Sequence, residues 1–84
     1  MNNNRVALQT VINTGLGLMS LNVTKEQYET WISYSKSVLS MVSNNPSLMT
    51  NYLGVILSAS NPSLMYYQKI SMCLRYLIGI QHLI

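Results

Sequence analysis

Charged residues are scarce in this 84-residue chain: they make up 8% of it, against roughly 25% in an average soluble domain. The five basic residues outnumber the two acidic ones, Glu26 and Glu29, and aspartate is absent, so the net charge of +3 reflects a lack of acid. A chain with so little charge has a weak electrostatic field. It also lacks the clustered basic residues on which nucleic-acid binding usually depends.

The same shortages exclude most kinds of active site. With one histidine, His82, and no aspartate, a Ser-His-Asp triad cannot be assembled. The two carboxylates, Glu26 and Glu29, fall in the first turn of one predicted helix, where they serve capping and the helix dipole, so an active site built on paired carboxylates is also excluded. A single cysteine, Cys73, excludes an intrachain disulfide and a zinc site of several thiolates. We predict that Cys73 is a buried, inert thiol; if it were reactive, Lys69 at i−4 would lower its pKa. We therefore expect no catalytic residue, no cofactor and no metal, and a protein that is not an enzyme.

Long apolar runs are missing as well. No stretch of about 18 uninterrupted apolar residues occurs, so we expect no transmembrane segment. The first residues, Met1–Arg5, lead into a run broken by polar side chains, which is not typical of a secretory signal. We expect a cytoplasmic, intracellular protein.

One pentapeptide occurs twice, as Asn-Pro-Ser-Leu-Met at residues 45–49 and 61–65. Asparagine is a favoured helix N-cap, and proline suits the first helical position, where its missing N–H would have no intrahelical partner. The repeat therefore predicts one helix from Pro46 to about Ser58 and another from Pro62 to about Gln81, joined by about three residues. This capping chemistry is sufficient reason for the repeat; a duplicated helix unit is the alternative.

The first half of the chain predicts two more helices. Apolar residues follow one helical face from Arg5 to Met19, and we expect that helix to end near Gly15 or Gly17, since glycine lowers helix propensity.

The second helix has the best-defined start. Thr24 followed by Gln27 three residues later is a capping-box pattern, and Glu26 places negative charge in the first turn. Apolar residues then recur at helical spacing, which predicts an amphipathic helix over about 25–43.

These elements predict an all-α protein: one domain over residues 1–84, folded as a compact orthogonal or up-down bundle of three to four short helices. The third helix is apolar nearly all round, which is typical of a central helix with neighbours on several sides. The residues expected in the core are Trp31, Ile32, Leu39, Leu53, Ile56, Ile70, Leu74 and Leu77. Since so short a chain buries only about 60 to 65% of its unfolded surface, we expect added stability from an oligomer or a bound partner.

The function predicted from this pattern is non-catalytic. We expect a small adaptor, inhibitor or assembly subunit that presents an apolar helix surface to another protein or to copies of itself. Aromatic residues and methionine are favoured in the cores of such interfaces. The residues predicted to contact the partner are Tyr66, Tyr67, Ile80, Leu83 and Ile84.

A nucleic-acid-binding regulator is the alternative. The third and fourth helices with a turn of about three residues match a helix-turn-helix, in which Gln68, Lys69 and Arg75 would face the nucleic acid. Against it, phosphate contacts typically need several basic residues along one face, and the proposed reading helix has only two.

Overall fold

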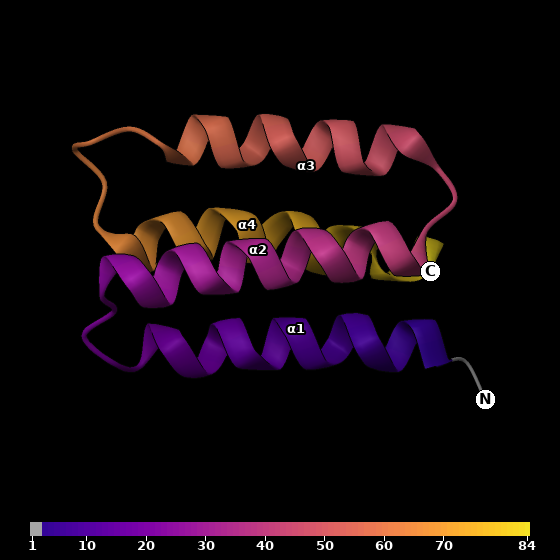
Figure 1. Cartoon of the computed structure of the whole chain (residues 1–84), viewed down its shortest axis with the longest axis horizontal. Coiled ribbons are helices and arrows are strands. Elements are labelled where there is room, and N and C mark those ends of the chain that lie inside the picture. Colours follow the sequence, from indigo (N-terminus) through magenta and orange to yellow (C-terminus); the bar gives the residue numbers. More distant parts are fainter. Residues whose placement is uncertain (1–2) are drawn as a thin grey trace.

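Four helices lie side by side along the long axis of the protein, each antiparallel to the next, in an up-down bundle (Figure 1). The computed structural model describes residues 3–84 and measures 37 × 23 × 18 Å. The helices are α1 (Asn3–Met19), α2 (Lys25–Val42), α3 (Pro46–Ala59) and α4 (Tyr66–Ile80), followed by the short 3₁₀ helix η1 (Gln81–Leu83). The predicted all-α bundle is confirmed, and no strand occurs between residues 3 and 84.

The third helix is not central. α2 and α4 form the middle of the bundle, α1 and α3 flank them on opposite sides (Figure 1), and α1 makes no contact with α3. The main neighbour of α3 is α4, with a smaller contact to α2. The prediction of a central third helix is therefore wrong, and one side of this apolar helix has no neighbour in the described chain.

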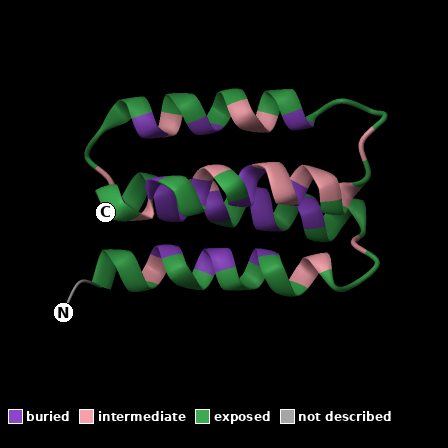
Figure 2. Cartoon of the chain, turned by 180° about the vertical axis from the view of Figure 1, so that it is seen from behind, coloured by how far each residue is buried: buried purple, intermediate pink, exposed green. Residues whose placement is uncertain are grey.

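The buried residues lie on the sides of the helices that face the axis of the bundle (Figure 2). Six of the eight predicted core residues are buried: Trp31, Ile32, Leu39, Ile70, Leu74 and Leu77. Ile56 is half-buried and Leu53 is 47% exposed, so the prediction for Leu53 is wrong. The reason is the position of α3 at the edge, where only the side marked by Leu48, Tyr52 and Ala59 is buried.

The contact between α1 and α2 depends on a glycine. The ring of Trp31 lies so close to Gly15 that a Cβ there would be 2.7 Å from the nearest ring carbon, and the indole Nε1 donates to the carbonyl of Val11 at 3.1 Å. Gly15 therefore makes room for a partner helix and does not end its own. The predicted end near Gly15 or Gly17 is wrong, since α1 continues to Met19.

The starts of α2 and α3 agree with the predictions. Thr24 Oγ1 accepts from the N–H of Gln27 at 3.1 Å, and Gln27 Oε1 accepts from the N–H of Thr24 at 3.0 Å, which completes the capping box. At the head of α3, Asn45 Oδ1 accepts from the N–H of Ser47 at 2.9 Å, with Pro46 in the first helical position. Both helices thus begin where their local chemistry predicts.

The second copy of the pentapeptide does not start a helix. Asn61 Oδ1 accepts from the N–H of Ser63 at 2.9 Å, but this bond closes only a turn, after which Met65 is extended with φ −77° and ψ 157°. α4 begins at Tyr66, and Gln68 Oε1 accepts from the N–H of Met65 at 2.7 Å. The predicted start at residue 62 is wrong by four residues.

Tertiary packing explains the difference between the two copies. In the first copy Leu48 is buried, so continuing the helix places an apolar side chain in the core. The equivalent Leu64 is only half-buried, whereas the ring of Tyr66 packs on that of Tyr28 with centroids 5.4 Å apart. Packing has overridden a favourable local cap.

Two hydrogen bonds hold α3 on the bundle. Ser35 Oγ lies 2.7 Å from the carbonyl of Ile32 and 2.6 Å from the hydroxyl of Tyr52. Because the single hydroxyl proton of Ser35 goes to that carbonyl, Tyr52 is the donor in the second bond. The hydroxyl of Tyr76 donates to the carbonyl of Leu48 at 2.7 Å, and its ring stacks on that of Tyr52.

Candidate functional site

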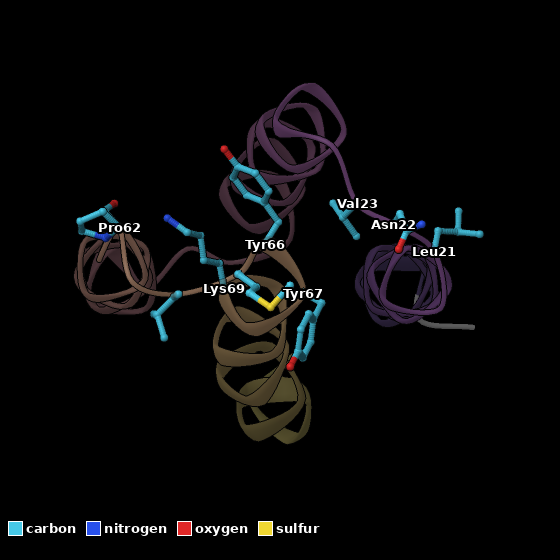
Figure 3. Close-up of a pocket in the computed structure, with 10 residues that line it drawn as sticks. Leu21, Asn22, Val23, Pro62, Tyr66, Tyr67 and Lys69 are labelled. Atoms are coloured by element: carbon cyan, nitrogen blue, oxygen red, sulfur yellow. The ribbon is translucent and has the colours of Figure 1, made fainter.

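A hollow of about 650 Å³ lies at the end of the bundle where the α1–α2 and α3–α4 connections meet (Figure 3). We call it the loop-end hollow. Its walls are mainly apolar or aromatic, and they include Leu21, Val23, Pro62, Leu64, Tyr66 and Tyr67. Residues more than forty positions apart in the sequence therefore share one site.

The only charged side chain in this hollow belongs to Lys69. Its Nζ lies 5.9 Å from the ring centroid of Tyr28 and 5.6 Å from that of Tyr66, which is within the range of cation–π attraction. Burial raises the pKa of Tyr28 to about 12, so the phenol is neutral at physiological pH and does not neutralise the ammonium. Within residues 3–84, Lys69 has no carboxylate partner.

The five residues predicted to contact a partner fall into two separate places. Tyr66 and Tyr67 both line the loop-end hollow, Tyr66 half-buried and Tyr67 44% exposed. The other three lie at the opposite end of the bundle. Leu83 is 57% exposed and Ile84 half-buried, but Ile80 is buried in the core at 7% exposure, so its prediction as a contact residue is wrong.

The three residues of the helix-turn-helix alternative do not form one reading face. The side-chain oxygen of Gln68 accepts a hydrogen bond from the N–H of Met65 at the start of α4, and Lys69 lies over the rings of Tyr28 and Tyr66. Arg75 lines a different groove, between α3 and α4. The expected three-residue turn is wrong, because residues 60–65 connect the two helices, and α3 runs alongside α4 (Figure 1) and does not cross it at the 90–120° of that motif.

The structure has a second apolar surface, which the sequence pattern did not predict. On the solvent side of α3, Leu57 is 76% exposed and Leu53 47% exposed, with Thr50, Gly54 and Ser58 on the same exposed side. We call these five residues the α3 outer face. α3 contains no charged residue at all. The apolar, uncharged sequence of α3 is the one feature that could have indicated this surface, but the same pattern is typical of a buried, central helix.

The polar groups with chemically reactive side chains are dispersed or buried. Over the described range 3–84, no three His, Cys, Asp or Glu side chains come together as metal ligands. Cys73 is buried as predicted, and burial raises the pKa of its thiol to about 11. Lys69 is directed at the tyrosine rings, and His82 is exposed near the C-terminal end. None of the described helices combines the length and apolar character needed to cross a membrane.

No family model matches this chain, and comparisons with curated proteins and with solved structures also gave no match.

Proposed function

We propose that this chain is a non-catalytic protein–protein interaction module that associates with copies of itself through the α3 outer face. The observation that carries the proposal is the exposure of Leu57 and Leu53, at 76% and 47%, on a helix without charge. Burying one leucine side chain completely stabilises by about 1.5–3 kcal/mol. The two leucines together expose little more than one full leucine, so a partner that covers both gains about 2–4 kcal/mol toward a weak dimer.

Charge favours a second copy as the partner. Each chain has five basic and two acidic residues, so two copies that meet through their basic residues repel locally, and an uncharged surface avoids that repulsion. Among the helices of residues 3–84, α3 is the one without a charged side chain. In a twofold dimer the same patch lies on both sides of the interface, and a patch without charge is compatible with itself.

The shape of the α3 outer face supports close packing. A Cβ built on Gly54 would meet no atom within 4 Å, so the backbone there is open to an approaching helix. Paired helices lie about 8–10 Å apart, depending on the side chains between them. Leu53 and Leu57 flank Gly54, so a close approach of the two helices there allows both leucines to pack against the second copy's α3.

An interface large enough for a stable dimer would extend beyond α3 itself. A stable interface typically buries about 800 Å² per partner, roughly a seventh of the 5194 Å² surface of the described chain. The adjoining groove between α3 and α4, lined by Met72, Arg75 and Tyr76 among others, is the extension the geometry favours. Arg75 is the one charged residue among the described residues that line it, so the uncharged part of the interface is the α3 outer face itself.

Sedimentation equilibrium over a range of protein concentrations tests the proposal. We expect the mass of the unmodified protein to rise from 9.5 kDa toward twice that value, and the double variant Leu53→Lys/Leu57→Lys to stay at the monomer mass. The matched control is Leu16→Lys, because Leu16 is 50% exposed on α1, on the opposite flank. A protein that stays monomeric throughout, or a Leu16→Lys variant that loses association equally, would contradict the proposal.

A further inference from the structure

We propose that the loop-end hollow is a second binding site, which takes a peptide segment of a partner protein in which an acidic residue stands next to a large apolar one. This inference rests on the proposed function as an interaction module, but it uses a surface separate from the α3 outer face. It would make the protein an adaptor with one face for its own copy and another for a foreign chain.

The walls of the hollow suit an apolar side chain. At 650 Å³ the hollow falls within the range of about 300–1,000 Å³ typical of ligand sites. Leu21, Met65 and Tyr67 are 59%, 62% and 44% exposed, so large apolar area remains uncovered at its edge. A bound side chain would remove part of that area from water.

The positive charge in the hollow favours an acidic residue next to the apolar one in the bound peptide. The Lys69 ammonium rests over two tyrosine rings and has no carboxylate partner in the described chain. Glu29 stands beside Tyr28 on α2 but forms no ion pair with Lys69. In addition, the first turn of α4 contains no acidic residue, so the partial positive charge of its N-terminus is not neutralised there. An incoming carboxylate would complement both positive groups.

A peptide segment fits this chemistry better than a small molecule. Small-molecule sites orient their ligand with several placed polar groups, whereas this hollow offers one charged side chain among mainly apolar walls and is bordered by two connections. A segment of chain needs less orientation, because its carboxylate can reach Lys69 while the adjacent side chain packs against the apolar wall of the hollow.

The test is NMR titration of the full chain labelled at its methionine methyl groups. Met65 lines the hollow, and Met41, 67% exposed in the last turn of α2, is an internal control outside it. The probes are two peptides that differ in one group: acetyl-Gly-Glu-Leu-Phe-Gly-amide and the same peptide with Gln in place of Glu. We expect both peptides to shift Met65 and not Met41, with the Glu peptide binding about twofold to fivefold more tightly, as exposed ion pairs allow.

Charge variants identify the group responsible. We expect Lys69→Gln to abolish the preference for the Glu peptide, Lys69→Arg to retain it, and Lys36→Gln, which removes one positive charge elsewhere on α2, to leave it unchanged. A Met65 signal that neither peptide moves, or a preference that persists in Lys69→Gln, would overturn the inference.

The outcome is separable from that of the proposed self-association. The double variant Leu53→Lys/Leu57→Lys is expected to bind the Glu peptide as the unmodified protein does, since neither leucine lines the hollow. A protein that dimerises but leaves Met65 unmoved would refute this inference and leave the proposed function standing. Peptide binding that vanishes together with dimerisation would show that the site depends on the dimer and would also overturn the inference as stated.

Discussion

At the scale of single residues, Gly15 packs closely against the ring of Trp31. A Cβ at Gly15 would come within 2.7 Å of that ring, whereas one at Gly17 would meet nothing within 4 Å. We expect Gly15→Ala to lower the free energy of unfolding by about 1–3 kcal/mol through overpacking, and Gly17→Ala to raise it by about 0.5–1 kcal/mol through helix propensity. Urea unfolding measures both. Equal stabilisation by the two variants would contradict the packing described.

The buried pair of Ser35 and Tyr52 gives a second prediction. Ser35→Ala leaves the hydroxyl of Tyr52 without its acceptor at 0% exposure, which costs about 1–3 kcal/mol. Tyr52→Phe costs less, about 1 kcal/mol, because Ser35 still donates to the carbonyl of Ile32. We expect the double variant to be more stable than Ser35→Ala alone, as measured by chemical denaturation. A double variant whose loss equals the sum of the single losses would show that the two hydroxyls do not depend on each other.

At the scale of elements, the two copies of the pentapeptide show how much a local pattern determines. Capping chemistry predicted the start of α3 at Pro46 and the start of α2 at Lys25, where structure and sequence agree. It failed for α4, because the packing of Tyr66 on Tyr28, 38 residues away in the sequence, decides where that helix begins. The hydrogen bonds of a helix cap join residues close together in the sequence and can be predicted from it. A packing contact between residues far apart in the sequence cannot.

The start of α3 provides the prediction at this scale. Asn45→Ala removes the acceptor for the N–H of Ser47 and is expected to cost about 1 kcal/mol of folding stability. Asn44→Ala is the matched control, since Asn44 is exposed and does not cap the helix; we expect it to change stability by less than about 0.5 kcal/mol. Thermal unfolding followed by circular dichroism compares them. Equal effects of the two substitutions would mean that the Asn45 side chain does not stabilise α3.

The place of each helix in the bundle was less predictable than its bounds. A helix buried on all sides in the core and a helix that carries an interface can have the same apolar sequence. The middle of the bundle is formed by α2 and α4, and in α4 the side chains of Ile70, Cys73 and Leu77 are each 0% exposed. For the candidate site, sequence pointed to Tyr66 and Tyr67, but not to Leu21, which reaches the hollow from the α1–α2 connection.

At the scale of the whole molecule, the buried thiol and phenol groups make the free energy of unfolding fall at high pH. The pKa of the Cys73 thiol rises from 9.0 to about 11 on folding, because burial disfavours the thiolate. Between pH 9 and 11 the unfolded chain therefore binds fewer protons than the folded one, and stability falls as pH rises. Tyr28, whose pKa rises from 10.0 to about 12, extends the decline to higher pH.

We expect Cys73→Ala to lessen the fall of the unfolding free energy between pH 9 and 11 and to retain the decline above pH 10 that is due to Tyr28, Tyr52 and Tyr76, because burial raises the pKa of each of these phenols. Urea unfolding at a series of pH values measures this directly. An unchanged slope from pH 9 to 11 in the variant would contradict the thiol's contribution.

The central claim about the whole molecule is that the α3 outer face is covered by a second copy in solution. The direct measurement is the distance between spin labels in two copies, made possible by the burial of the one native cysteine. A label at Thr50→Cys on α3 is predicted to give distances below about 25 Å, since paired helices lie about 8–10 Å apart. A label at Gly17→Cys, on the opposite flank, should give roughly twice the 23 Å width of the bundle. No dipolar coupling from the Thr50 site, or a shorter distance from the Gly17 site, would contradict the claim.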